Sequence, residues 1–329
     1  MIHINTPSLS SYTFIDLFSG IGGFHLALNS FGAKCVYACE WDKFAKQVYT
    51  NNFNIIPDDD ITKVKEDNIP DHDILCAGFP CQPFSISGKQ LGFNDCRGTL
   101  FFDIARIINA KKPKLLILEN VKNLISHNNG DTFKTIYNTL SNLNYNVFYK
   151  VLNAADFNIP QHRERIFIVG VRKDIPADMF TFPEPIPLQK HLVDCLLNNN
   201  DADYLFLNNH KNLNLYNNNI NVKYDNKPIR IGCVNKGYQG ERIYSPKGVA
   251  ITLSANGGGI FSKTGGYLIN DKVRKLHPRE CARIMGFPDD FIICDNKNQA
   301  YKQFGNAVVV DVVQYILLQI INSNILYEK

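Results

Sequence analysis

The fold of this chain is decided by the stretch Asp73-Ile74-Leu75-Cys76-Ala77-Gly78-Phe79-Pro80-Cys81-Gln82-Pro83-Phe84-Ser85. Its apolar start is typical of a buried parallel strand. The two prolines that flank Cys81 exclude a helix across it. The pattern predicts a thiol on a stiff turn at the carboxyl end of a strand, where open α/β sheets bind ligands. Taken alone, such a cysteine is more often an ordinary buried side chain.

Length and composition favour a globular protein with one large and one smaller domain. The chain has 329 residues, of which 45% are hydrophobic and 20% charged. Its nine cysteines lack the paired spacing of a zinc site, so we expect free thiols in a reducing compartment and no metal. The first eleven residues are polar and no apolar run approaches a membrane span, so we expect a cytoplasmic protein without a membrane partner.

Basic charge is concentrated in one part of the chain. Residues 229–285 contain 10 Lys and Arg against 3 Asp and Glu, whereas the net charge of the whole chain is only +4. A basic face suits contacts with nucleic-acid phosphates, although a surplus of this size is usually a solvated surface.

A glycine turn near the N-terminus predicts a nucleotide-binding βα unit. Residues 13–18 read as a strand, Ser19-Gly20-Ile21-Gly22-Gly23 as the turn and 24–31 as an amphipathic helix. The turn alone is weak evidence, because dehydrogenases use the same device. The next strand, 34–39, ends in Glu40, about twenty residues beyond the glycines, where a carboxylate can accept both ribose hydroxyls.

Two further segments could surround an adenine ring. Trp41 follows the ribose acid and could pack on the adenine face, although a lone Trp is more often core. Asp60 could accept from the adenine amino group while Ile61 covers the ring. The alternative for this acidic run is a solvated turn.

The middle of the chain supplies polar groups that could face Cys81. Residues 85–99 are polar and glycine-containing, and predict a mobile loop. A helix over 100–110 and a strand over 114–118 follow, and the strand delivers Glu119 next to the strand that presents Cys81. Helix 131–143 and strand 145–152 then lead to Arg163 and Arg165, which we expect on one side of a strand entry. Such arginines are usually a surface ladder, but beside a reactive carboxylate they become orienting groups.

The last part of the chain predicts a small β domain followed by helices. Residues 198–226 contain 12 asparagines and read as a polar connection. Short strand-like pieces separated by glycines follow from residue 228, which suits loops presented to a nucleic-acid groove. A capped helix then runs to residue 285, and an apolar helix closes the chain.

The octapeptide 78–85, followed by Glu119-Asn120-Val121, resembles the catalytic signature of the cytosine carbon-5 methyltransferases, and the other motifs of that family follow in its order. The resemblance covers essentially the whole chain. It implies an α/β fold with a Rossmann-like S-adenosylmethionine-dependent methyltransferase domain and a smaller, β-rich target-recognition domain. The implied division is a catalytic and cofactor domain over 1–195, target recognition over 196–277, a hinge over 278–305 and a C-terminal helix over 306–329 that returns to the first domain.

The resemblance also implies three sets of site residues. The catalytic set is Cys81, Glu119, Arg163 and Arg165. The set for S-adenosyl-L-methionine, with S-adenosyl-L-homocysteine as product, is Phe18, Ser19, Gly20, Ile21, Gly23, Glu40, Trp41, Asp60, Ile61, Gly78, Pro80, Leu100, Asn306 and Ala307. The set for double-stranded DNA is Ser85, Ser87, Lys89, Arg97, Gln239, Glu241, Arg242, Thr252 and Gly257.

The implied chemistry begins with a thiolate, because carbon 5 of an aromatic cytosine is a poor nucleophile. Addition of Cys81 to carbon 6 makes the ring electron-rich, and a nearby arginine would lower the thiol's pKa. Glu119 would share a proton with ring nitrogen 3, and Arg165 would hold the carboxylate and the ring oxygen. The target must first leave the duplex, and Ser87 and Gln239 are assigned to the space that it leaves. Arg242 and Glu241 are candidates for base-edge contacts, and Thr252 for a phosphate contact.

Within the family, the resemblance is closest to a monomeric bacterial modification enzyme that methylates the inner cytosine of GCGC. It implies a possible cognate restriction endonuclease without a stable complex. The sequence departs from that relative at Tyr238, at Asn256, where an aromatic residue is expected, and throughout 198–228. Pro83 departs from that relative but agrees with the wider family.

Three alternatives remain open at this point. A tRNA cytosine methyltransferase shares the core but lacks a glycine-rich recognition segment like 237–266. A nicotinamide-dependent oxidoreductase explains only the glycine turn. A non-catalytic DNA-binding homologue would have no use for the intact Cys81.

Overall fold

The computed structural model describes residues 9–80, 100–198, 202, 205, 207, 212–216 and 222–326. The chain separates into two compact units. One unit, called here the sheet unit, comprises residues 2–152, 164–183 and 313–329. The other, called the loop unit, comprises residue 1, 153–163 and 184–312.

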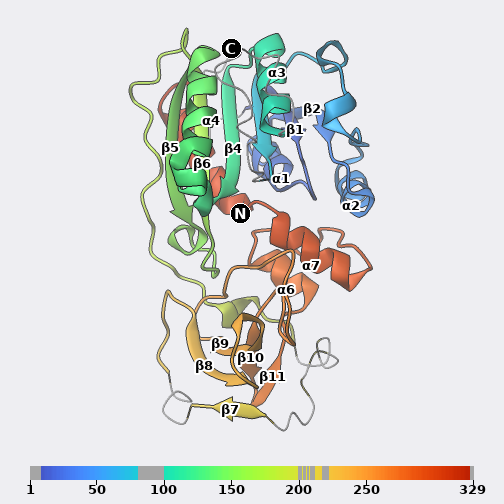
Figure 1. Ribbon diagram of the computed structural model, residues 1–329, viewed down its shortest axis with the longest axis vertical. Helices are drawn as coiled ribbons and strands as arrows, with labels where there is room; N and C mark the ends of the chain where they lie inside the picture. Colours follow the sequence, from blue (N-terminus) through green and yellow to red (C-terminus); the bar gives the residue numbers. More distant parts are fainter. Residues whose placement is uncertain are drawn as a thin grey trace. The chain divides into compact units, whose positions relative to one another are not determined.

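The sheet unit is built on a six-stranded sheet with the order β2-β1-β3-β4-β6-β5 (Figure 1). Strands β1, β2, β3 and β4 pair in parallel, whereas β6 runs antiparallel to β4. The predicted α/β fold is therefore confirmed, with a mixed sheet. The strands are β1 (Thr13–Leu17), β2 (Lys34–Cys39), β3 (Ile74–Gly78), β4 (Leu115–Val121), β5 (Tyr145–Asn153) and β6 (Glu164–Arg172).

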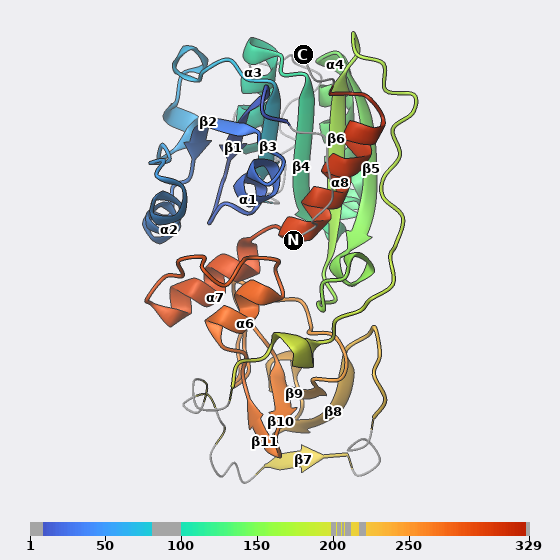
Figure 2. The same ribbon diagram turned by 180° about the vertical axis from the view of Figure 1, so that it is seen from behind.

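Helices cover both faces of this sheet. Helices α3 (Leu100–Lys111) and α4 (Asp131–Asn142) lie over the face in front in Figure 1. Helix α1 (Gly23–Asn29) and the apolar α8 (Val310–Asn322) lie over the opposite face (Figure 2), where Gln314 Nε2 donates to Ser30 Oγ at 2.8 Å. Helix α2 (Lys43–Phe53) follows β2.

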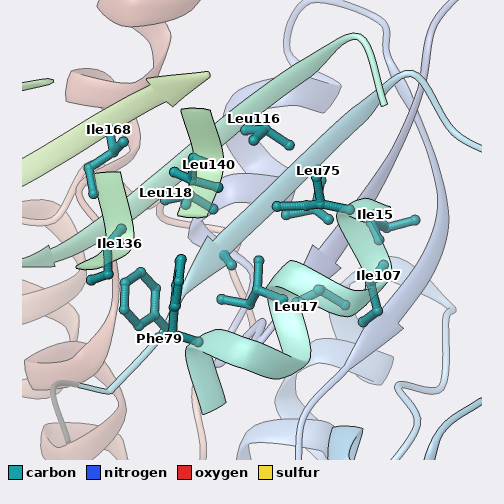
Figure 3. Packing of buried hydrophobic residues seen from close by; sticks show 14 of the residues in the cluster. Ile15, Leu17, Leu75, Phe79, Ile107, Leu116, Leu118, Ile136, Leu140 and Ile168 are labelled. Carbon is teal, nitrogen blue, oxygen red and sulfur yellow. The ribbon is translucent and has the colours of Figure 1, made fainter. Parts of the chain in front are cut away.

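The core beneath α3 and α4 anchors the residues that lead to Cys81. Leu17 of β1, Leu118 of β4 and Ile136 of α4 are wholly buried in it (Figure 3). Phe79 is 5% exposed and packs against Phe101, with ring centroids 5.7 Å apart. The end of the described segment before Cys81 is therefore fixed by apolar burial, which removes surface from water in proportion to area.

The loop unit contains a five-stranded sheet with the order β11-β10-β9-β8-β7. A small core including Ile231, Ile243 and Phe261 lies within it. The helices α6 (Pro278–Arg283) and α7 (Lys297–Asn306) follow the sheet. The strands are β7 (Leu213–Leu215), β8 (Ile229–Val234), β9 (Arg242–Ser245), β10 (Gly266–Ile269) and β11 (Lys272–Arg274).

Two of the strand ends that differ from the sequence prediction bear on the site. Strand β1 ends at Leu17, because Phe18 has a positive φ of 53° and already belongs to the glycine turn. Strand β4 continues to Val121, since its pairing with β6 extends the ladder beyond Leu118. Glu119 therefore lies within a strand and not after one.

One apolar stretch, residues 297–322, is long and apolar enough to cross a membrane by length and composition alone. However, 72% of its most apolar window is buried inside the protein, which is typical of a core helix. The seven cysteines within the described ranges are free thiols. The same ranges contain no group of three His, Cys, Asp or Glu that could hold a metal ion.

Candidate active site

The glycine turn after β1 depends on backbone conformations that favour glycine. Gly20 and Gly22 have φ values of 55° and 88°. A Cβ at Gly22 would lie 2.2 Å from the ring of Phe53, so helix α1 approaches α2 too closely for any side chain there. Ser19 N donates to Cys39 O at 3.0 Å, which ties the turn to the end of β2.

Glu40 holds this turn through both carboxylate oxygens. One oxygen accepts from Gly20 N and the other from Asp42 N, each at 2.8 Å. The residue is 9% exposed, and burial raises its pKa although these N–H groups oppose the shift. The N–H of Trp41 also opposes the rise of this pKa, and a carboxylate offers about four lone-pair sites, so acceptor capacity remains beside these donors. A hydroxyl pair of a ligand could therefore be accepted by a carboxylate that is already fixed in place.

The other predicted cofactor residues around the turn differ in exposure. Trp41 is 80% exposed, so its ring is not part of the core. Ile61 is 3% exposed and belongs to the core. One oxygen of Asp60 accepts from Thr62, at the start of a short 3-10 helix, and the other lies 3.2 Å from Lys63 Nζ. Ile21 is 2% exposed, whereas Phe18 and Leu100 are half-buried.

A carboxylate and a guanidinium meet beside the end of β3. Gly78 and Glu119 are register partners across β3 and β4. Arg165 Nε lies 3.2 Å from Glu119 Oε1, and the two side chains are only 16% and 10% exposed. A Cβ at Gly78 would be 3.8 Å from Glu119 Oε2, so glycine leaves the carboxylate uncovered on that side.

The segment that leads to Cys81 is fixed beside this pair. Asn120 Nδ2 donates to Phe79 O at 2.8 Å, which fixes the chain just before the turn, and Pro80 is exposed. Sequence reasoning assigned no role to Asn120, although it directly follows the predicted acid. The predicted residues Cys81, Ser85, Ser87, Lys89 and Arg97 lie outside the described residues.

Arg163 has different surroundings from Arg165. It belongs to the loop unit, directly before β6, and is 2% exposed. Its two terminal nitrogens donate to main-chain carbonyls: Nη1 to Leu253 at 3.0 Å, and Nη2 to Gly305 at 3.0 Å and Ala307 at 2.8 Å. The two arginines that the sequence placed together thus act on different elements.

Two glycine-rich loops of the loop unit pack main chain against main chain. A Cβ at Gly240 would lie 1.9 Å from Gly258 O, and Phe261 N donates to Gly240 O at 2.8 Å. The contact brings exposed Gln239 and exposed Gly257 onto neighbouring loops. It explains why bulkier residues would not fit there.

Some polar and charged side chains of these loops and of the neighbouring segments form hydrogen bonds within the protein. Glu241 accepts from Asn235 Nδ2 and Tyr238 N, each at 3.1 Å, and these bonds lower its pKa. Arg242 is half-buried, and its Nε makes no hydrogen bond among the described residues. Thr252 Oγ1 donates to His162 O at 2.5 Å. Asn306 is exposed at the end of α7, next to buried Ala307.

A glycine turn held by a buried carboxylate, together with an acid in a neighbouring strand that pairs with an arginine, is typical of α/β enzymes that use a nucleoside cofactor. The chain belongs to the C-5 cytosine-specific DNA methylase family, which it matches over residues 12–322. It is a DNA (cytosine-5-)-methyltransferase.

Individual relatives agree with this assignment. The chain is 56% identical to the type II methyltransferase M.HhaI of Haemophilus parahaemolyticus over 98% of both chains. It is 43% identical to M.SsoII of Shigella sonnei over 95% of this chain and 80% of that one. The S. pombe Dnmt2 methyltransferase shares the fold, with a TM-score of 0.72 at 21% identity over 94% of this chain and 98% of that one.

Proposed function

We propose that the chain methylates carbon 5 of cytosine in double-stranded DNA through a flipped base and a covalent Cys81 adduct, with S-adenosyl-L-methionine as methyl donor. The observation that carries this proposal is the Glu119–Arg165 pair, in register with Gly78 at the start of the Cys81 turn. The family assignment supplies the reaction class, and the pair supplies the groups that would manage charge on the ring.

The residues around the glycine turn fit the proposed cofactor. Glu40 is buried and fixed with lone pairs to spare, which suits ribose hydroxyls. The exposed ring of Trp41 could cover an adenine, and Asp60 could accept from its amino group. When bound, S-adenosyl-L-methionine supplies an electrophilic methyl group on a sulfonium. The proposed holding residues are Phe18, Ser19, Gly20, Ile21, Gly23, Glu40, Trp41, Asp60, Ile61, Gly78, Pro80, Leu100, Asn306 and Ala307.

The protein's own residues would act on the cytosine in sequence. The Cys81 thiolate adds to carbon 6, and the electron pair of the 5,6 double bond moves into the ring. Glu119 gives or shares a proton at nitrogen 3 and so prevents negative charge from accumulating there. Arg165 holds the carboxylate in place by the contact described above and contacts the ring oxygen. After methylation, loss of the carbon-5 proton expels the thiolate and restores the aromatic ring.

Base flipping is required because carbons 5 and 6 of a stacked cytosine cannot reach the proposed catalytic groups. Ser87 and Gln239 would occupy the space left in the duplex. Arg242 and Glu241 would contact base edges, Thr252 the phosphate of the flipped nucleotide, and Ser85, Lys89, Arg97 and Gly257 the surrounding DNA. The main-chain contact between Gly240 and Gly258 supports joint action of the two recognition loops.

The resemblance described in the sequence analysis implies GCGC as the target. The similarity to the type II methyltransferase M.HhaI supports modification beside a restriction endonuclease as the biological role. We further propose a monomeric, cytoplasmic bacterial enzyme that forms no stable complex with the nuclease. In functional terms, residues 1–195 would carry catalysis and cofactor binding and 196–277 target recognition, with 278–305 as hinge and 306–329 as the returning helix.

Bisulfite sequencing of plasmid DNA from cells that express the protein tests activity and target together. We expect the inner cytosine of GCGC to be methylated and therefore protected from conversion by bisulfite. In cells with a Cys81→Ser variant, the same cytosine should be converted. DNA containing 5-fluorocytosine should trap the wild-type protein covalently, because fluorine at carbon 5 cannot leave as a proton does. Unprotected GCGC beside another protected motif would refute the target. A fully active Cys81→Ser variant would refute the mechanism.

A further inference from the structure

Arg163 connects segments that are distant in the sequence. Its side chain is 2% exposed and bridges the carbonyl of Leu253 and those of Gly305 and Ala307. A guanidinium presents its donors in a rigid planar fork, so the carbonyls it binds are held in a fixed mutual geometry. Asn306, a proposed cofactor residue, stands between the two held residues at the end of α7.

Gln161 binds the main chain of the same residue, Leu253. It is wholly buried; its Oε1 accepts from Leu253 N at 3.1 Å, and its Nε2 donates to Ile284 O at 2.7 Å. Both polar groups of Leu253 are thus bound by side chains, the N–H by Gln161 and the C=O by Arg163. Thr252, the proposed phosphate contact, directly precedes this residue and donates to His162 O.

The end of α7 also contacts the segment 254–255, through main-chain atoms of Gly305. A Cβ at Gly305 would lie 2.3 Å from Ala255 N and 2.4 Å from Ser254 C. Main chain therefore packs directly on main chain, which only glycine permits. This contact is independent of Arg163 and joins the same two segments, 252–255 and 305–307.

We propose that Gln161 and Arg163, called here the clamp, are positioning residues that hold Thr252 and Asn306 in a fixed relative position, called here the frame. The clamp would thereby set both the DNA-phosphate contact and a cofactor contact. The proposal rests on the proposed function, which assigns those two contacts. It gives Arg163 no direct contact with the cytosine ring or the Cys81 thiolate, because its terminal nitrogens are engaged by carbonyls.

The test compares Arg163→Lys and Gln161→Glu with Arg172→Lys, a control at an arginine that pairs with exposed Asp174 away from the proposed site. Lys keeps the charge and loses the fork, whereas Glu keeps the acceptor for Leu253 N and loses the donor to Ile284 O. Loss of a buried hydrogen bond should raise the KM for DNA and the KM for S-adenosylmethionine together, each by roughly tenfold. The rate at saturation of both should fall by less than about threefold, because uniform binding is what the clamp supports.

A second readout separates positioning from direct catalysis. The rate of covalent trapping on 5-fluorocytosine DNA is measured against pH at saturating ligands. The midpoint, the pH at which the trapping rate is half its maximum, should be the same in wild type and Arg163→Lys if Arg163 acts only by positioning Thr252 and Asn306. An upward shift of the midpoint, or a fall in kcat with both KM values unchanged, would overturn the proposal.

Gly305→Ala tests the frame with both clamp side chains intact, and it keeps the proposal falsifiable if a clamp variant fails to fold. The added methyl group collides with the main chain of 254–255, so both KM values should rise here too. Unchanged KM values in a folded Gly305→Ala protein would contradict the inference. A wild-type protein without methylation activity would instead refute the proposed function, so the two failures are distinguishable.

Discussion

At the scale of single residues, Glu119 is the group whose proposed role depends most on its protons. Glu119→Gln retains the shape of the side chain but cannot give a proton to the ring and return as a carboxylate. General acid catalysis contributes about 10²- to 10⁴-fold, so methylation should fall by a factor in that range. Single-turnover transfer of a labelled methyl group measures the loss.

Glu164→Gln is the matched control for this substitution. Glu164 is the neighbour of Arg165 in β6, but its carboxylate pairs with Lys122, whose side chain is 52% exposed. Such surface pairs contribute little, so activity should stay within about twofold of wild type. Equal losses in the two variants would show that Glu119 acts through the stability of β4 and β6 and not through chemistry.

Asp16 provides a pH-dependent prediction away from the chemistry. The residue lies in β1, is wholly buried, and its carboxyl oxygens make no hydrogen bond among the described residues. Burial, reinforced by Glu40, raises its pKa well above the usual value. Above about pH 3.9 the unfolded chain releases this proton, whereas the folded chain retains it up to its higher pKa. Between these two pKa values, Asp16 therefore lowers the free energy of unfolding more and more as the pH rises.

An Asp16→Asn variant should therefore gain stability over wild type as the pH is raised from 5 to 8. Urea unfolding at several pH values measures the difference in the free energy of unfolding. Asp71→Asn is the control, because the Asp71 side chain is 94% exposed and pairs with Lys111 across a surface contact. A gap between Asp16→Asn and wild type that narrows toward high pH would contradict the sign of the pKa shift.

At the scale of elements, a buried ion pair joins β11 to α6. Arg274 and Glu280 are both fully buried and form a two-bond pair at 2.7 and 2.6 Å. Glu280 also accepts from Leu197 N and His277 N, so one carboxylate connects a strand, a helix start and a loop. Removal of one partner leaves a buried charge without compensation.

Glu280→Ala should lower the free energy of unfolding by about 3–5 kcal/mol. The matched control is Asp289→Ala. Asp289 pairs with Arg283 and its side chain is 61% exposed, so its removal should lower the free energy of unfolding by at most about 1 kcal/mol. Chemical denaturation followed by circular dichroism compares the two. Similar costs would show that the buried pair contributes no more than a surface pair.

The elements also show what could be predicted from the sequence. The glycine turn, the acid after β2 and most strands of the first sheet are local patterns, and they were predicted to within a few residues. Helices α2 and α7 and strand β7 were not predicted. The antiparallel insertion of β6 between β4 and β5 depends on pairing partners, which no local pattern specifies. The partners of Arg163 lie 90 to 144 residues away, so its position between carbonyls could not be read from the spacing of two arginines.

At the scale of the whole molecule, the cofactor proposal predicts selective stabilisation of the folded chain. A ligand that binds only the folded state at a hundred times its Kd adds about 2.7 kcal/mol to the free energy of unfolding. S-adenosylhomocysteine should therefore raise the Tm by a few degrees, whereas NAD at the same concentration should not. The comparison separates a methyltransferase site from a dehydrogenase site, which share the glycine turn.

Glu40→Gln connects this measurement to the proposed ribose contact. The substitution leaves one oxygen to accept from Gly20 N or Asp42 N, but not both, and it weakens acceptance of a hydroxyl pair. About tenfold more S-adenosylhomocysteine should be needed for the same rise in Tm, as expected for the loss of one charge-assisted hydrogen bond. If NAD stabilised the wild type equally, the site would not be selective for the proposed cofactor. If Glu40→Gln left the S-adenosylhomocysteine dependence unchanged, the buried carboxylate would serve only the conformation of the turn.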